Sequence, residues 1–134
     1  MCKCMLRQYL YLSTAPNLNT KDIENILESC QRNNRERNVT GLLLYNGRNF
    51  MQLLEGEEVD LMWVMRRISS DARHSGISAL EDMAAEERAC PDWHMRRIRL
   101  VDEVEDRRAA LDAELPANLV PELRRVMLNF AALN

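Results

Sequence analysis

Apolar residues recur along the chain in two periods, one typical of strands and one typical of helices. A first strand is predicted over residues 5–13, where strand-forming side chains run into the turn-prone sequence TAPNLN. Thr20 is the predicted cap of a helix. The apolar face of that helix has helical spacing and consists of Ile23, Ile26, Leu27 and Cys30. Asn33 and Asn34 follow on the same stripe, so two amides stand where core residues are expected.

Two further strands are predicted over residues 39–45 and 48–56. Asn46-Gly47 separates them, and this dipeptide is the preferred one for a two-residue hairpin turn. Both faces of these strands are largely apolar, which is typical of central strands rather than edge strands. Gln52 is therefore expected in the middle of the sheet, as an amide inside an otherwise apolar run.

The second half of the chain continues with helical and strand-like segments. A helix is predicted over residues 59–70, an additional strand over 77–86 and a last strand over 93–101. The resulting order, βαββαβ with one additional strand, predicts a ferredoxin-like α+β fold with two helices on one sheet face. Short amphipathic helices predicted over residues 104–115 and 122–133 would cover the other face.

Composition narrows the classes of function. The chain has 134 residues, 46% of them hydrophobic and 29% charged, as expected for one globular domain. Its net charge of -3 gives no basic footprint for nucleic acid or an anionic membrane. The chain lacks a long apolar run and the apolar region of a signal peptide, so a cytoplasmic location is predicted. The cysteines lack the spacing of a metal site, and reduced thiols are predicted at Cys2, Cys4, Cys30 and Cys90.

Three polar side chains converge in the predicted topology. The helix ending at Asn34 leads into the strand that pairs with the strand of Gln52, and the first strand places Tyr11 beside Gln52. A buried amide taken alone usually satisfies a backbone group. A phenol and several amides at one end of a two-helix layer instead favour a neutral heteroaromatic ligand that carries donors and acceptors.

Four segments resemble a BLUF domain, the blue-light sensor that uses flavin. They are YLYLSTAPNL, CQRNNRERNVTGLLLYNGRNFMQLLEGEE, RRISSDARHSGI and EERACPDWHM. Their joint pattern is N-N-x(5)-T-G, M-Q-L-L-E-G, D-x-R-H and P-D-W-x-M, and the likeness runs from about Tyr9 to Arg99. The resemblance implies that the two helices on one sheet face hold a flavin, with FAD expected and FMN or riboflavin as alternatives.

The resemblance also implies roles for individual positions. Tyr11 matches the photoactive tyrosine, and Gln52 matches the glutamine that lies between this phenol and the flavin ring. Asn34 matches the asparagine that bonds the polar edge of the ring, and Asn33 lies beside it. Ile26 matches an apolar contact on the ring face, although ordinary core packing explains it equally well.

Further matches follow the second helix and the last predicted strand. The family's ribityl and phosphate contacts correspond to Arg67, Asp71, Arg73 and His74. The alternative for these four residues is a solvated helix end. Trp93 and Met95 match a mobile tryptophan and methionine that relay the signal, and without the family Trp93 would be read as core.

The resemblance thus implies a light sensor and not an enzyme. Residues 1–100 are the predicted photosensor domain, and residues 101–134 are a helical cap that passes the signal to a protein partner or a second subunit. One alternative is a ligand-free ferredoxin-like interaction module. An acylphosphatase-like hydrolase would need an arginine in TAPNLNT, which has none, and a flavin oxidoreductase would need a substrate pocket over the ring.

Overall fold

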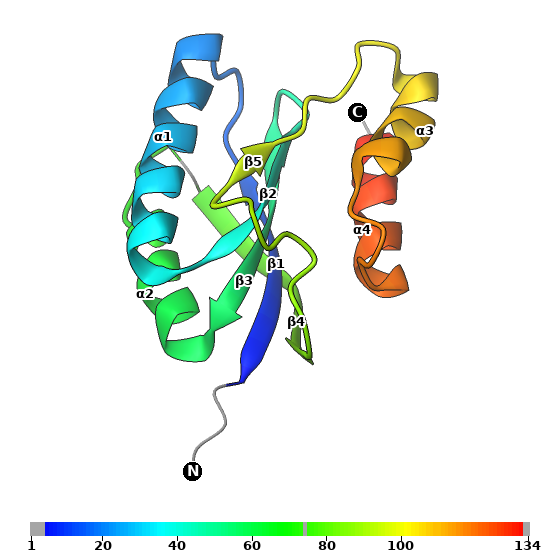
Figure 1. The fold of residues 1–134 in the computed structure, drawn as a ribbon. Helices are drawn as coiled ribbons and strands as arrows, with labels where there is room; N and C mark the ends of the chain where they lie inside the picture. Colours follow the sequence, from blue (N-terminus) through cyan, green and yellow to red (C-terminus); the bar gives the residue numbers. More distant parts are fainter. Residues whose placement is uncertain (1–4, 74, 133–134) are drawn as a thin grey trace.

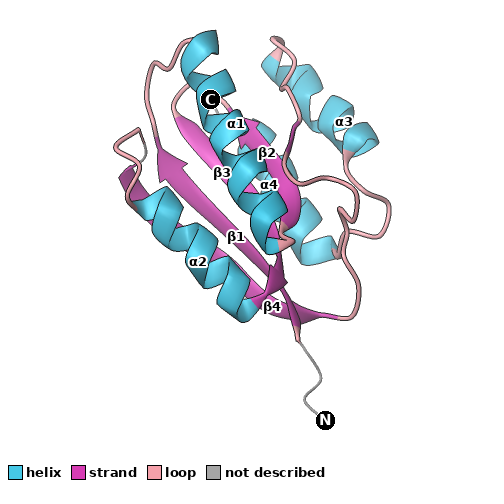
Figure 2. Ribbon diagram, turned by 60° about the vertical axis from the view of Figure 1, so that its left-hand side comes forward, coloured by secondary structure: helices cyan, strands magenta, loops and turns pink. Residues whose placement is uncertain are grey.

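A five-stranded sheet separates two pairs of helices in the computed structural model, which describes residues 5–73 and 75–132. Helices α1 and α2 cover one face of the sheet, and helices α3 and α4 lie over the other (Figures 1 and 2). The elements in chain order are β1 (Leu6–Thr14), α1 (Thr20–Arg37), β2 (Thr40–Tyr45), β3 (Asn49–Glu57), α2 (Glu58–Ser69), β4 (Ser75–Ala85), β5 (Arg96–Arg97), α3 (Val104–Glu114) and α4 (Pro121–Ala132).

The sheet has the strand order β4-β1-β3-β2-β5, which confirms the predicted ferredoxin-like arrangement with one additional strand. The predicted long last strand over 93–101 is wrong. The fourth ferredoxin-like strand is β4, which pairs antiparallel with β1, whereas the two-residue β5 is the additional strand and runs parallel to β2. Outside β5 this segment passes along the sheet edge, with Trp93 and Ile98 packed toward the tail helices and Met95 toward α1 and α2.

Helix α1 differs from its prediction at both ends. Asn19, not Thr20, caps it: Asn19 Oδ1 accepts the backbone N–H of Asp22 at 2.8 Å, and Asp22 Oδ2 accepts that of Asn19 at 3.2 Å. This reciprocal capping box satisfies two backbone donors at once. The helix continues past Asn34 to Arg37 and is capped by Asn38, whose φ of 54° is left-handed. Asn34 therefore lies inside the helix, near its last turn.

The hairpin between β2 and β3 is confirmed, but its turn lies one residue further along than predicted. The backbone N–H of Asn46 donates to the carbonyl of Asn49 at 3.2 Å, which places Gly47 and Arg48 at the turn's centre. Asn46 Oδ1 also accepts the backbone N–H groups of Arg48 and Asn49 at 3.0 and 2.8 Å. Gly47 has a φ of +94°, a conformation that side chains with a Cβ rarely adopt.

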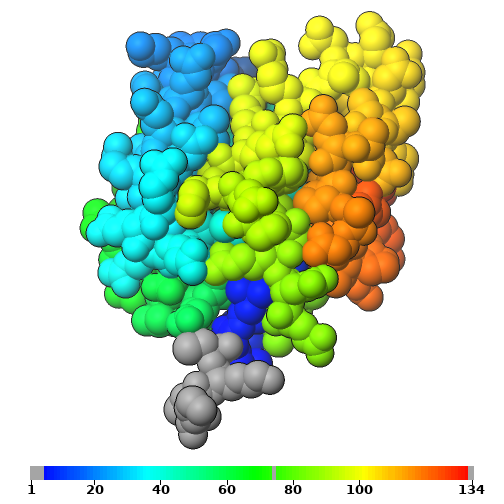
Figure 3. Space-filling model, viewed as in Figure 1, coloured from blue at the N-terminus to red at the C-terminus, as the bar shows by residue number. Residues whose placement is uncertain are grey.

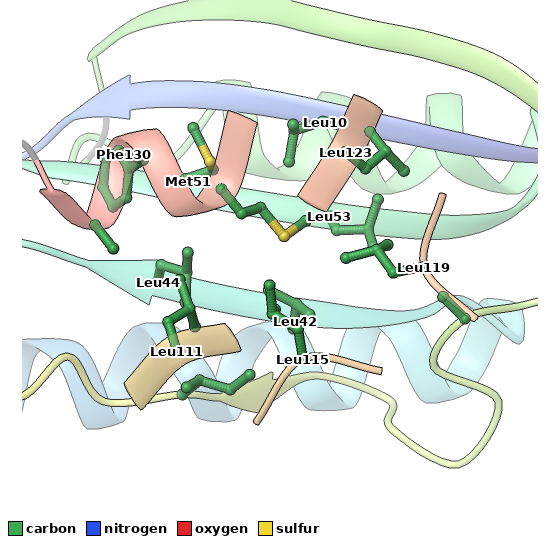
Figure 4. Packing of buried hydrophobic residues seen from close by; sticks show 14 of the residues in the cluster. Leu10, Leu42, Leu44, Met51, Leu53, Leu111, Leu115, Leu119, Leu123 and Phe130 are labelled. Carbon is green, nitrogen blue, oxygen red and sulfur yellow. The ribbon is translucent and has the colours of Figure 1, made fainter. Parts of the chain in front are cut away.

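Both faces of the central strands are buried, as predicted. Leu43 and Tyr45 pack toward α1 and α2, whereas Leu42 and Leu44 pack toward the tail helices α3 and α4. Figure 4 shows the second of these cores, in which side chains from the sheet meet side chains from the tail helices. Its labelled members are Leu10, Leu42, Leu44, Met51, Leu53, Leu111, Leu115, Leu119, Leu123 and Phe130. The predicted cover of this face is confirmed, although residue 133 of the last predicted helix lies outside the described residues.

No helix in the described part of the chain is both long enough and apolar enough to span a membrane.

Candidate functional site

A cleft lies between α1 and α2 on the face opposite the tail helices. It is lined by Ile26, Ser29, Cys30, Asn33, Asn34, Val64, Arg67, Ile68 and Asp71. Five of the residues predicted to contact flavin are among them, namely Ile26, Asn33, Asn34, Arg67 and Asp71. On α1 the lining residues recur every three or four positions, because that spacing puts them on one helix face. The structure thus brings the two predicted asparagines and part of the α2 end to one cleft.

Asn34 is fully buried, and the two polar atoms of its side-chain amide differ in their hydrogen-bond partners. Its Nδ2 donates to the carbonyl of His94 at 2.6 Å. No donor among the described residues reaches its Oδ1. A buried acceptor without a donor is destabilising, by about 1–3 kcal/mol. Asn34, which lines the cleft, therefore carries a buried acceptor without a donor while its amide nitrogen holds the chain before β5.

Tyr11 and Gln52 form a buried pair behind this cleft. Their strands β1 and β3 are neighbours, as predicted, and the antiparallel register places the two residues directly opposite each other. The Tyr11 hydroxyl donates to Gln52 Oε1. Neither side chain is more than 1% exposed. Burial raises the pKa of Tyr11 well above its ordinary value, so the phenol stays neutral and keeps its proton near neutral pH.

The amide nitrogen of Gln52 meets only sulfur atoms among the contacts that the structure records. Gln52 Nε2 lies 3.3 Å from Met95 Sδ and 3.7 Å from Cys30 Sγ. Thioether and thiol sulfurs are weak acceptors. The donor end of this amide therefore has no strong partner here, and its one strong hydrogen bond is the one that Oε1 accepts from Tyr11. Neither Gln52 nor Tyr11 lines the cleft itself, and Cys30 lies between the pair and the cleft.

Cys30 lines the cleft, although the sequence predicts it only as a core position and a reduced thiol. It lies four residues after Ile26 and four before Asn34, so the helical period alone assigns it to the cleft face. Cys30 and Cys90 are free thiols, whereas Cys2 and Cys4 lie outside the described residues. In the described ranges, no three His, Cys, Asp or Glu side chains gather closely enough to hold a metal ion.

The Cys30 thiol gives a pH-dependent prediction. Burial raises its pKa from the ordinary 9.0 to about 11, so its contribution to stability is complete below pH 9 and is lost as pH rises through about 11. We expect the free energy of unfolding to fall over this window, and to fall less in Cys30→Ser, which has no thiol to ionise. Urea denaturation at several pH values measures both slopes. Tyr11 and Cys90 titrate in both proteins, so equal slopes would contradict the prediction.

The residues at the end of α2 are held by defined contacts. Asp71 lines the cleft and Arg73 does not, but the two form a bidentate ion pair. Arg73 Nε donates to Asp71 Oδ1 at 2.9 Å, and Arg73 Nη2 donates to Asp71 Oδ2 at 2.7 Å. This hydrogen bonding raises the pKa of Arg73. The Arg67 guanidinium lies 4.6 Å from the ring centroid of Trp63, so Arg67 is not simply a solvated end. His74 lies outside the described residues.

Trp93 and Met95 precede β5 and lie on opposite sides of the sheet edge. Met95 is buried beside Gln52, as its sulfur contact shows. Trp93 is half-buried against the tail-helix core, with the Arg96 guanidinium 4.6 Å from its ring centroid. Of these two residues, the structure therefore brings only Met95 to the Tyr11–Gln52 pair.

The fold and site define a class of protein: a ferredoxin-like domain with a cleft between two helices on one sheet face and a buried phenol–amide pair near it. A family model described as sensors of blue-light using FAD matches residues 6–96. The chain therefore belongs to the BLUF family, whose members are flavin-binding blue-light sensors.

Curated relatives are much longer than this chain. Photoactivated adenylate cyclase subunit beta of Euglena gracilis is 33% identical over 94 residues, which are 68% of this chain and 11% of that protein. The blue light- and temperature-regulated antirepressor BluF of Escherichia coli is 43% identical over 60 residues, 45% of this chain and 15% of that protein. The chain thus spans only about a tenth to a seventh of these relatives.

Solved structures match nearly the whole chain. The dark-state structure of BlrB, a BLUF protein, has a TM-score of 0.73 at 30% identity and covers 95% of this chain and 94% of its own. The BlrP1 BLUF structure has a TM-score of 0.80 at 25% identity, with coverages of 98% and 93%. These matches include the tail helices as well as the sheet, because their coverage exceeds the span of residues 6–96.

Proposed function

We propose that the cleft between α1 and α2 is the flavin site of this sensor and that the Tyr11–Gln52 pair is its light-driven switch. The observation that carries the proposal is the buried Oδ1 of Asn34, which accepts from no donor among the described residues and belongs to a residue that lines the cleft. An N–H group on the edge of the flavin ring would satisfy this acceptor and recover the cost of its burial.

The other lining residues fit the remaining parts of the same ligand. Ile26 and Val64 provide apolar surface for the ring faces, and Asn33 adds a second amide beside Asn34. Arg67 supplies a cation at the rim for the phosphate of a flavin tail, and the Arg73–Asp71 pair fixes the orientation of the rim carboxylate. This combination of apolar walls and a few placed polar groups is typical of cofactor sites.

Tyr11 and Gln52 are the residues proposed to respond to light. A bound flavin excited by blue light supplies a strong oxidant. Tyr11 can give up an electron, and its proton can pass along the existing hydrogen bond to Gln52 Oε1. When the charge recombines, Gln52 remains rotated or tautomerised, with donor and acceptor exchanged. The exchange gives up only weak sulfur contacts at Gln52 Nε2.

The signal is proposed to leave by contact. One altered hydrogen bond is worth about 1 kcal/mol, which can bias only an element that is already near balance. The segment that holds Met95 is that element, and residues 101–134 are the proposed output segment toward a protein partner or a second subunit. We also propose that the protein is cytoplasmic and forms a homo-oligomer.

FAD is the proposed flavin, because the family description names it. FMN is the alternative, since one solved BlrP1 structure contains FMN. The ring contacts proposed above do not discriminate between the two, and a mass spectrum of the released flavin would.

An absorption spectrum of the purified protein, before and after blue illumination, tests the proposal. We expect a yellow protein whose flavin band shifts to the red on illumination and returns in the dark. A colourless protein after flavin is supplied would favour the ligand-free interaction module. A yellow protein that does not shift but is bleached by nicotinamide donors would indicate a flavin oxidoreductase instead.

A further inference from the structure

Glu55 is a fully buried carboxylate on the sheet face opposite the cleft. It lies three residues after Gln52 on β3, and successive side chains of a strand point to opposite faces. Glu55 forms one cross-strand row with Gln8 on β1 and Thr40 on β2. It is therefore outside the proposed flavin site, on the side of the tail helices.

Four donors surround this carboxylate. The backbone N–H groups of Ala89 and Cys90 donate to Oε2 and Oε1 at 2.6 and 2.7 Å. Gln8 Nε2 donates to Oε2 at 2.8 Å, and Thr40 Oγ1 donates to Oε1 at 3.3 Å. A carboxylate is tolerated in the interior only when such donors compensate its desolvation, and hydrogen bonds to a charged acceptor are stronger than neutral ones. Glu55 thus holds two consecutive backbone groups of the chain that follows β4.

The chain held by Glu55 is the same one that reaches the buried pair. Residues 88–95, here called the strap, begin on the tail-helix face at Glu55 and end on the other face, where Met95 Sδ contacts Gln52 Nε2. Between these ends, the carbonyl of Trp93 accepts the backbone N–H of Gly41 at 2.8 Å. Figure 3 shows this yellow-green part of the chain on the surface between the blue-cyan α1 and the orange helices of the tail.

The anchored end of the strap also contacts the tail. Asn118, in the turn between α3 and α4, donates from Nδ2 to the carbonyl of Arg88 at 3.1 Å and to Glu87 Oε1 at 3.3 Å. The Arg88 guanidinium in turn donates to Thr40 Oγ1 at 2.8 Å and to the carbonyl of Glu55 at 3.0 Å. One short segment therefore joins Gln52, Glu55 and the tail helices.

We propose that Glu55 is a positioning residue for signalling: it fixes the start of the strap, so that a change at Met95 is passed through Asn118 to α3 and α4. Without this anchor, the strap would absorb the change by relaxing at its free end. The inference rests on the proposed function, since the change at Met95 begins with Gln52. Glu55 itself does not take part in the photochemistry.

The test compares amide hydrogen exchange of α3 and α4 in the dark and under blue light, with the flavin absorption shift recorded on the same samples. Glu55→Gln is isosteric, but its amide group turns a donor toward one strap N–H. We expect this variant to keep the absorption shift and to lose most of the light-minus-dark exchange difference, about threefold or more, the scale on which mutations modulate coupling.

Two surface variants keep the test decisive even if Glu55→Gln folds poorly. Asn118→Ala removes the hydrogen bond between the strap and the tail and should reduce the exchange difference similarly. The control Asn129→Ala removes a hydrogen bond to Arg108 within the tail and should leave the exchange difference unchanged. A wild-type exchange difference that persists in Glu55→Gln or Asn118→Ala would overturn the inference, as would a wild type that shifts in colour without any difference in the tail. Absence of the colour shift in the wild type would instead refute the proposed function.

Discussion

Replacing Tyr11 by phenylalanine is expected to abolish the reversible absorption shift while leaving flavin bound. The substitution removes only the hydroxyl that donates to Gln52 Oε1, and the ring stays in a fully buried position. Without that hydroxyl the proposed electron and proton donor is gone, so the loss should be essentially complete. Absorption spectra before and after illumination measure the effect.

Tyr9→Phe is the matched control for this experiment. Tyr9 lies two residues earlier on β1, on the same face, with its ring centroid 6.5 Å from that of Tyr11. Because its hydroxyl is not bonded to Gln52, this variant should keep a normal shift. A normal photocycle in Tyr11→Phe would overturn the proposed donor role, whatever the control shows.

Replacing Gln52 by leucine should give a coloured protein that does not respond to light. Leucine has no donor or acceptor to exchange, so the switch is lost although the side-chain volume is similar. The Tyr11 hydroxyl would also lose its partner in a buried site, which should destabilise the protein by about 1–3 kcal/mol. Spectra under illumination and a urea titration measure the two effects.

Gln8→Leu controls for the removal of a buried amide. Gln8 is 2% exposed and donates to Glu55, and both residues lie on the sheet face opposite the cleft. Loss of this amide should therefore also lower the free energy of unfolding. It should leave the absorption shift intact, because Gln8 is remote from the cleft face. Retention of the shift in Gln52→Leu would refute the switch.

The pattern of apolar residues predicts the fold class and the central strands. Continuous burial of β2 and β3 follows from their two-sided apolar composition, and the ferredoxin-like strand order makes the strands of Tyr11 and Gln52 neighbours. The asparagines of α1 were detected because amides on an apolar stripe contradict the period of the helix. These features can be predicted because they depend on the order of apolar and polar residues within single elements.

The errors have a different origin, because they arise where tertiary contacts override local preference. The segment over 93–101 alternates like a strand, but only two of its residues pair with β2. Before them, the carbonyl of Trp93 accepts the backbone N–H of Gly41 at the start of β2, and the carbonyl of His94 accepts the side-chain amide of Asn34 on α1. Glu55 gave no signal in the sequence either, since a glutamate at a strand end is usually solvated, and the donors that enclose it come from residues far along the chain.

The leucine-rich contact between sheet and tail bears on how this sensor could be transplanted. Cutting the chain near residue 100 would strip the cover from Leu42, Leu44 and Leu53, three side chains that are now inaccessible to water. The exposed surface would invite aggregation. Chimeric photoswitches should consequently be joined beyond Ala132, with both terminal helices retained as part of the graft.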